Sequence, residues 1–544
     1  MKQKSFLIIA LLFIVAGRVG AQGVPAPDAE ISADDAKVTG GILRTPLLKD
    51  TLVVNPETGQ EEMVSIVKDH IDIPVDELHG DVQEAVSRAR ARAATRASDY
   101  MEYANYYSGV SFYLYTFNYP SIDKEGKTVT LSSLFAFPYF DDDDLKKNYK
   151  FNGVVIGCHC TITSNKECPS MYVEDGYFKS DVNMMQYYAS FGKGRPKKDN
   201  DDPAYYNIVV MPDYEGYGET KYNPHPYLYQ ELTARQVVDG TRYGLALFKA
   251  GKFVRKDDYS QTTAQKWPNC MRTDWGVVTV GASQGGSVAM AVHRYIEQNG
   301  LDVRDELPMK GSVCCDGPYD PVATLRYYMS EDKASKHQAG WLTMPVAIAL
   351  IVKGMLDTNP LMMGHKATEY FSEKFIRTGL FECIENKSNP SMEKTTTDIT
   401  DHLKSLYSKN KDLRDLLDSD GRMNLKYALT PTAYEYFSNF PTEVPTTRGV
   451  MEDLHRALDS NNLTKNWTPK HPICLYHSKR DTVVPWVNYE SAVNAFRGPG
   501  ITLYLDDTSN DKDHQDACAS FYFAYFDTAP DINFIRRLCG YPTD

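Results

Sequence analysis

The sequence predicts an α/β fold, in which a mostly parallel β-sheet carries helices on both faces. Short apolar runs such as "GVVIGCHC" and "NIVVMPDYEGYG" recur along the chain, and stretches of helix-forming residues separate them. Strands that alternate with helices are typical of a parallel sheet that is covered on both sides. The chain has 544 residues, 42% of them apolar, which is enough for one large domain with an insertion or for two domains.

The first 22 residues resemble an export signal. Lys2 and Lys4 precede the apolar run from Phe6 to Ala16, and the small residues Gly20 and Ala21 follow it. This order of charge, apolar run and small residues is typical of a cleaved secretory signal, and the run is too short to span a bilayer. We therefore expect residues 1–22 to be removed, the protein to be exported to the periplasm or the exterior, and no transmembrane segment.

The net charge bears on the partners of the protein, and the cysteines bear on disulfides and metal sites. The net charge of −13 and the isoelectric point near 5.5 argue against nucleic acid, whose phosphates would be repelled. Ten cysteines in an exported chain predict disulfides, with Cys518 and Cys539 as one candidate pair. Cys158, His159 and Cys160 do not predict a metal site, because in a strand the two thiols would share one face and the imidazole would lie on the other.

The N-terminal part, residues 23–110, predicts an arm followed by a helix. Residues 23–80 are polar and mixed without a clear period, so we expect at most a short strand there. Helix formers without Gly or Pro predict an amphipathic helix from Asp81 to Tyr103.

The main α/β core is predicted to begin at residue 111, and its first part is predicted to run to residue 322. The stretch "SFYLYTFNYPSIDKEGKTVTLSSLFAFPY" predicts two antiparallel strands joined across Asp123 to Gly126. The strand–helix alternation follows, with helices predicted from about Glu231 to Lys252 and from Ala289 to Gln298. The acidic run Asp141 to Asp144 and the charged stretch Lys197 to Asp202 are predicted to be solvated loops.

An insertion interrupts the strand pattern from residue 323 to residue 470. Helical patterns replace the strands there, including "GWLTMPVAIALIVKGML", and they predict a helical cap over the sheet. The strand pattern returns in residues 471–544 with "PICLYHSKRDTVVP" and "ITLYLDD". The second part of the core should therefore follow the cap.

Ser283 lies where an apolar strand runs into a helix, in "WGVVTVGASQGGSVAMAVHRY". Residues 281–285 match G-x-S-x-G, whose serine occupies a sharp turn that exposes its hydroxyl. Small neighbours are needed because larger side chains would collide with adjacent elements. A phosphate-binding turn is the alternative, but the sequence has neither the lysine of a P-loop nor the glycine spacing of a dinucleotide site. We therefore predict that Ser283 is a nucleophile and that the protein uses no cofactor and no metal.

The nucleophile needs a base, and the base needs a carboxylate that holds it in the correct tautomer. In this order of elements the acid and the base follow the serine. Asp481 comes after the predicted strand "PICLYH", and His514 is the one histidine downstream of it. We predict that Asp481 and His514 complete the triad, with Asp320, Asp506 and Asp507 as rival acids.

The oxyanion of a tetrahedral intermediate needs two preorganised N–H donors. The backbone N–H of Gln284, at the start of the helix, is predicted to be the first. The second is expected from the loop "GCHCTITSN", from the backbone of Cys160 or Thr161.

Four stretches, "MPDYEGYG", "GASQGG", "DGPYDP" and "SKRDTVVP", resemble those of the α/β-hydrolase superfamily, and within it the secretory lipases and related secreted esterases. The resemblance runs from about Ser111 to the C-terminus, apart from most of the cap. It implies an α/β-hydrolase fold and a carboxylic ester hydrolase that acts on a small-molecule or lipid ester through an acyl-enzyme.

Two other functions share this fold. A serine peptidase of the prolyl oligopeptidase type uses the same triad, but it usually carries a large β-propeller, which the roughly 90 residues between the predicted signal and Ser111 cannot form. A non-catalytic binding protein is the third possibility, because a fold alone does not prove chemistry. For the ester hydrolase, we predict that the segment Trp341 to Leu356 forms a wall of the acyl pocket, and that Tyr214 and Tyr217 contribute to substrate binding.

Overall fold

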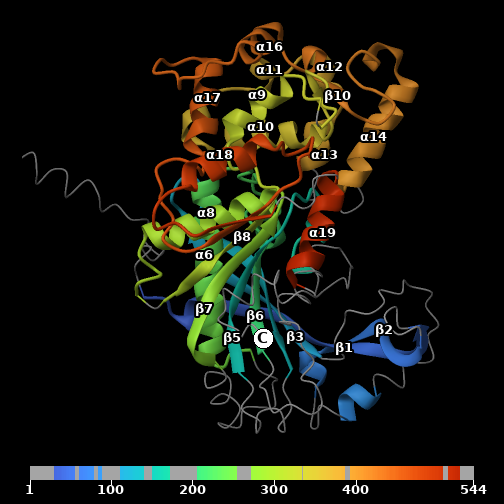
Figure 1. The fold of residues 1–544 in the computed structure, drawn as a ribbon, viewed down its shortest axis with the longest axis vertical. Coiled ribbons are helices and arrows are strands. Elements are labelled where there is room, and N and C mark those ends of the chain that lie inside the picture. The colour runs from blue at the N-terminus through green and yellow to red at the C-terminus, as the bar shows by residue number, and fades with distance from the viewer. Residues whose placement is uncertain are drawn as a thin grey trace, which may run out of the picture.

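The computed structural model describes residues 30–54, 60–78, 84–88, 111–139, 150–171, 205–253, 271–304, 306–333, 335–385, 393–506 and 512–526. The described strands form one ten-stranded sheet, with a two-stranded ribbon in the cap (Figure 1). The strands of the large sheet are β1 (Lys37–Val54), β2 (Glu61–Pro74), β3 (Phe112–Ile122), β4 (Thr128–Pro138), β5 (Lys150–Cys158), β6 (Tyr205–Pro212), β7 (Met271–Ala282), β8 (Met309–Cys315), β11 (Ile473–Tyr476) and β12 (Leu503–Asp506).

The strand order across the sheet is β12-β11-β8-β7-β5-β6-β4-β3-β1-β2. Parallel pairing joins the strands from β12 to β6, and antiparallel pairing joins those from β6 to β2. The predicted hairpin is confirmed as β3 and β4, whose residues pair from Phe112 with Pro138 to Ile122 with Thr128. The mostly parallel α/β sheet that the sequence predicts is therefore confirmed.

The N-terminal arm differs from the prediction, because it contains two long strands and not one short strand. β1 pairs with β3 only from Lys37 to Arg44, and from Ile42 to Val54 it pairs with β2. The distal part of the β1–β2 ribbon projects away from the sheet (Figure 1). Main-chain pairing between β1 and β2 defines that part, and the sequence has no clear period there. Of the predicted helix Asp81 to Tyr103, residues 84–88 are described, and they are helical.

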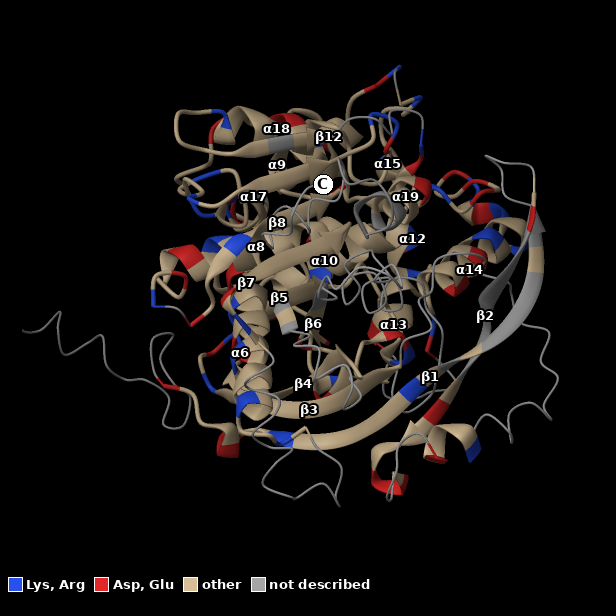
Figure 2. Ribbon diagram, turned by 60° about the horizontal axis from the view of Figure 1, so that its bottom comes forward, with Lys and Arg blue, Asp and Glu red and all other residues tan. Residues whose placement is uncertain are grey.

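Helices cover both faces of the sheet, as predicted (Figure 2). α6 and α8 lie side by side on one face, and α19 lies on the other. α8 begins directly after Ser283, five residues earlier than predicted. These helices and one further core helix are α6 (Gln230–Lys249), α8 (Gln284–Gln298), α18 (Val487–Phe496) and α19 (His514–Phe526). None of the helices in the described ranges is both long and apolar enough to cross a bilayer.

The elements between β8 and β11 are short helices and one small ribbon, which gather above the sheet (Figure 1). Their apolar side chains form a core of their own, separate from the core around the sheet. The elements are α9 (Pro321–Tyr328), β9 (Trp341–Leu342), α10 (Pro345–Thr358), α11 (Ala367–Tyr370), α12 (Glu373–Ile376), α13 (Leu380–Glu385), α14 (Thr396–Lys409), β10 (Met423–Asn424), α15 (Leu425–Ala428), α16 (Pro431–Ser438) and α17 (Val450–Ser460).

The disulfide prediction is not supported. No disulfide joins cysteines of the described part of the chain, and Cys518 is a free thiol. Cys539, its predicted partner, lies outside the described residues, as do the signal segment, the acidic run Asp141 to Asp144 and the stretch Lys197 to Asp202.

Candidate active site

Ser283 forms the turn between β7 and α8. Its backbone has φ 57° and ψ −125°, in the left-handed half of conformational space where residues other than glycine are uncommon. Two glycines allow this turn to pack closely. A Cβ on Gly285 would lie 2.0 Å from the carbonyl oxygen of Cys158, and a Cβ on Gly281 would lie 2.2 Å from the carbonyl oxygen of Gly285. The glycines of the motif are thus required by contacts within the turn and with the end of β5.

Ser283, His514 and Asp481 form a continuous hydrogen-bonded chain. His514 Nδ1 donates to Asp481 Oδ2 at 2.6 Å, and Ser283 Oγ donates to His514 Nε2 at 2.9 Å. An ionised carboxylate can only accept, which places the imidazole proton on Nδ1 and leaves Nε2 as the acceptor. The three side chains follow β7, β11 and β12, which are parallel strands whose carboxyl ends meet at one edge of the sheet.

Backbone N–H groups hold Asp481 in place. Its Oδ1 accepts from the N–H groups of Val483 and Val484, both at 2.8 Å, and the residue is fully buried. The rival acids have other positions: Asp320 caps α9 by accepting from Ala323, and Asp506 is the last residue of β12. Asp507 lies outside the described residues.

The surroundings of His514 favour its charged form. Burial by itself lowers the pKa of His514, because it disfavours an imidazolium. The negative charge of Asp481, the neighbouring Cys518 and the hydrogen bond to Asp481 together outweigh burial, and Asp316 adds the smallest of these contributions, so that the pKa lies well above its ordinary value. An imidazolium formed at this position during a reaction would therefore be stabilised.

The predicted oxyanion donors lie on two adjoining segments. Gln284 is the first residue of α8, where a backbone N–H has no carbonyl partner within the helix. Cys160 and Thr161 lie in the loop after β5, and the end of β5 at Cys158 packs closely against Gly285. Thr161 Oγ1 shares a hydrogen bond of 2.7 Å with the hydroxyl of Tyr227, which ties this loop to the segment after β6.

Tyr214 and Tyr217, which the sequence predicts to contribute to substrate binding, are both buried, with 1% and 0% of their surface exposed. The hydroxyl of Tyr214 donates to the carbonyl of His159 at 3.3 Å, and that of Tyr217 donates to the carbonyl of Ile162 at 2.5 Å. Through these two hydrogen bonds the tyrosines hold the loop that carries Cys160 and Thr161.

Trp341 lies in the small ribbon of the cap, half-buried, with the Arg422 guanidinium 5.8 Å from its ring centroid. Next to it, Thr343 Oγ1 donates to Thr482 Oγ1 at 2.9 Å. Thr482 follows Asp481 directly, so this part of the cap contacts the loop that holds the acid.

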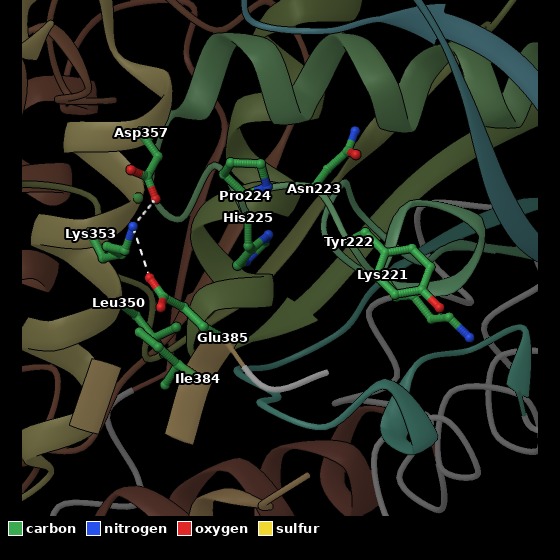
Figure 3. Close-up of a pocket in the computed structure, with 11 residues that line it drawn as sticks. Lys221, Tyr222, Asn223, Pro224, His225, Leu350, Lys353, Asp357, Ile384 and Glu385 are labelled. Carbon is green, nitrogen blue, oxygen red and sulfur yellow. Dashed lines mark hydrogen bonds and ion pairs between the residues drawn. The ribbon is translucent and has the colours of Figure 1, made fainter. Parts of the chain in front are cut away.

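A cavity of about 270 Å³ lies between the cap and the loop after β6 (Figure 3). α10 contributes Leu350 and Lys353 to its wall, and α13 contributes Ile384. His225 also lines the cavity, and its Nε2 accepts from Gln284 Nε2 at 3.0 Å. One side chain thus connects the cavity with the residue that follows Ser283.

Asp316 is a residue of this site that the sequence analysis missed. It directly follows β8, and an oxygen of its carboxylate lies within 4.8 Å of ligand-type atoms of both Asp481 and His514. Its place after a strand, at the start of "DGPYDP", is the same kind of signal that identified Ser283 after β7.

No protein-family model and no curated protein matches the sequence. Solved structures do: the rice cell wall degrading esterase LipA from Xanthomonas oryzae has 19% identity and a TM-score of 0.52, over 84% of this chain and 93% of its own. A protein from Legionella pneumophila has 16% identity and a TM-score of 0.50, over 80% and 91% of the two chains. Candida antarctica lipase A has 12% identity and a TM-score of 0.46, over 80% and 79%. The first two likenesses, with the strand order and the serine turn after β7, show that the chain has the α/β-hydrolase fold.

Proposed function

We propose that the protein is a serine hydrolase that cleaves carboxylic esters through an acyl-enzyme. The observation that carries the proposal is the hydrogen-bonded chain from Ser283 through His514 to Asp481. A hydroxyl is a weak nucleophile until a base accepts its proton, and this chain supplies the base in the tautomer that can accept.

The reaction would proceed in two halves. In the first, Ser283 Oγ attacks the ester carbonyl carbon while His514 Nε2 takes the hydroxyl proton and then gives it to the departing alcohol. In the second, His514 takes a proton from a water molecule as the water oxygen attacks the acyl-serine carbonyl carbon, and it then returns this proton to Ser283 Oγ as the bond to the serine breaks and the carboxylic acid is released. Asp481 keeps the imidazole in its tautomer and stabilises the imidazolium. The backbone N–H of Gln284, with that of Cys160 or Thr161, would donate to the oxyanion.

An ester is the favoured substrate class, small-molecule or lipid. LipA, which shares the fold, is described as an esterase, and the acidic chain offers no reason for a polyanionic substrate. A peptidase of the prolyl oligopeptidase type is the alternative with the same triad. The described N-terminal part is a two-stranded ribbon with a short helix, not the blades of a β-propeller, and this favours the esterase over the peptidase.

We further propose that the protein is exported. This proposal rests on the sequence of residues 1–22.

The test is Ser283→Ala, assayed on acyl esters of graded chain length with peptide substrates alongside. We expect ester turnover to fall on the order of 10⁴-fold, and labelling by a fluorophosphonate to disappear. Ser287→Ala is the matched control, since Ser287 lies one turn further along α8 and its hydroxyl donates to the carbonyl of Gln284. The control should still be labelled. Peptide cleavage that exceeds ester cleavage in the parent protein would favour the peptidase, and unchanged turnover in Ser283→Ala would remove the nucleophile.

A further inference from the structure

Asp316 has a backbone conformation that aspartate seldom adopts. Its φ is 41°, in the left-handed region, at the point where β8 ends. Its N–H donates to the carbonyl of Tyr476 at 3.0 Å, which ties the end of β8 to the end of β11. Strained residues of this kind occur often at functional sites, because the surrounding structure must hold them in place.

The Asp316 carboxylate is fully buried and lies behind the triad. Oδ1 accepts from the N–H of Ser478 at 2.9 Å and lies 3.4 Å from His477 Nε2, both on the loop that carries Asp481. Oδ2 accepts from the thiol of Cys315 at 3.4 Å. A thiol is a weak donor, so Oδ2 is the less satisfied of the two oxygens.

Two carboxylates thus share the neighbourhood of one imidazole. Ligand-type atoms of Asp316, Asp481 and His514 all lie within 4.8 Å of one another, and all three residues are buried. Buried charges at this separation interact strongly, because little water screens them. A positive charge on His514 would therefore be attracted by Asp316 as well as by Asp481.

We propose that Asp316 is a positioning residue of the triad, which holds the loop of Asp481 through Ser478 and places a second negative charge behind His514. This inference rests on the proposed function, in which His514 becomes an imidazolium at each step. Asp316 contacts neither Ser283 nor a substrate in this arrangement. It acts through Asp481 and His514.

The electrostatics of the neighbourhood agree with this role. Burial raises the pKa of the Asp316 carboxyl to about 6, with Asp481 acting in the same direction and His477 and His514 in the opposite one. The carboxyl is thus ionised above about pH 6. The groups that face it are Cys315 on β8, His477 and Asp481 on the loop after β11, and His514 and Cys518 on α19.

The experiment compares Asp316→Asn with the parent protein in the dependence of kcat/KM on pH. Asparagine keeps the size and the Ser478 acceptor and tolerates a positive φ, so the substitution mainly removes charge. Loss of the charge should lower the pKa of His514, so the acid limb should move to lower pH by roughly one unit, a tenfold change in the protonation constant. The high-pH plateau should fall about tenfold, because the imidazolium is less stabilised. A lower plateau with an unmoved limb would show a structural role only and would overturn the proposal.

Asp213→Asn is the matched control. Asp213 also directly follows a strand, β6, it is also buried, and burial also raises its pKa to about 6. Its carboxylate accepts instead from Ser132 Oγ at 2.6 Å and from the N–H of Ser170 at 2.7 Å. The control should leave the position of the acid limb unchanged, whatever its effect on the plateau. An equal shift in both variants would assign the effect to general loss of negative charge and would overturn the proposal.

A second measurement remains decisive if Asp316→Asn does not fold. In Asp481→Asn turnover should fall roughly 10⁴-fold, because the imidazole takes the wrong tautomer. The charge of Asp316 remains in this variant, so it should keep the acid limb of the residual activity at or above about pH 6.5, the ordinary pKa of histidine. A limb well below about pH 6.5, the direction that burial alone gives, would overturn the proposal. The proposed function fails differently, since in that case Ser283→Ala would keep its turnover and its label.

Discussion

His514 is held by its two partners in the one tautomer that can act as a base. Its Nδ1 is 2.6 Å from a carboxylate oxygen, and its Nε2 is 2.9 Å from the serine hydroxyl. The same carboxylate that orients the ring also favours the protonated ring, so the geometry that prepares the base makes it less available at low pH.

The pH dependence of ester hydrolysis should follow from this balance. His514 must be neutral to accept the serine proton, and its pKa in the folded protein lies well above the ordinary value of 6.5. Activity should therefore be low at pH values near 6.5 and below, and should rise as pH passes through the raised pKa. A profile of kcat/KM against pH, measured with chemistry rate-limiting, tests this. A rate that stays flat from about pH 5 to about pH 8 would contradict a histidine base.

The hydrogen-bonded chain of Ser283, His514 and Asp481 could be predicted from the sequence because each member carries a local signal. Ser283 has its glycines and its strand-to-helix position, and Asp481 and His514 have their order after it. The roles of Tyr214 and Tyr217 could not be predicted, since a tyrosine near a turn has the same sequence pattern whether it faces backbone or substrate. Only the fold shows that their hydroxyls donate to the loop after β5.

At the scale of elements, a buried carboxylate joins α8, the helix that follows Ser283, to the segment that leads from the cap back to the sheet. Glu297 lies near the end of α8 and is 4% exposed. It accepts from His293 Nε2 at 3.0 Å, Trp467 Nε1 at 2.9 Å, Lys470 N–H at 2.9 Å, and His471 through both N–H at 2.9 Å and Nδ1 at 2.7 Å. Because these donors already fill its oxygens, the cluster is a structural anchor and not a metal site.

Glu297→Gln should lower the free energy of unfolding by about 3 kcal/mol, since it leaves several buried donors with a weaker acceptor. Burial alone would raise the pKa of Glu297, but the hydrogen bonds from His293 and His471 lower it below its ordinary value. Such a carboxyl stabilises the fold above its unfolded pKa of about 4.5, and the contribution is lost as pH falls. The difference between variant and parent should thus shrink in acid.

Denaturant unfolding at neutral pH and in acid measures this effect. Glu490→Gln serves as the control, because Glu490 is exposed on α18 and should change the stability by less than about 0.5 kcal/mol. A loss for Glu297→Gln no larger than that of the control would show that the anchor contributes little.

The elements of the core were predictable where their pattern is set by burial. The central parts of β5, β6, β7 and β8, such as Val277 to Val280 of β7, are mostly apolar because both faces of the sheet are covered there. The β1–β2 ribbon could not be predicted in the same way. Its outer half pairs only with its partner strand, through main-chain hydrogen bonds that any residue except proline can make, and Leu52 there is 52% exposed.

On the scale of the whole molecule, the cap and the sheet are two apolar cores that meet at the site. Polar contacts join them there. Tyr227 bonds to the loop of Thr161, the hydroxyl of Tyr328 on α9 donates to the carbonyl of Val483, and Thr343 bonds to Thr482. The cap could be predicted from the break in the strand pattern, but its contacts could not, since they join residues more than 60 positions apart.

The cavity beside α10 allows a test of the prediction that the segment Trp341 to Leu356 forms a wall of the acyl pocket. Ala349, on the same helix, is fully buried in the cap core, so a large side chain there would disturb packing in general. Leu350 lines the cavity (Figure 3). Leu350→Trp should therefore reduce the cavity while the described contacts of Ser283 remain in place.

If the cavity accepts the acyl chain, Leu350→Trp should lower kcat/KM for long-chain esters and leave acetyl esters close to the parent value. Each methylene that can no longer be buried would cost about 0.8 kcal/mol, so the loss should grow roughly fourfold per methylene. Ile348→Trp is the matched control, because Ile348 is half-buried on α10 but is not among the residues that line the cavity. Rates on a series of esters of increasing chain length test this. An equal reduction at every length, or the same length dependence in both variants, would show that the cavity does not hold the acyl chain.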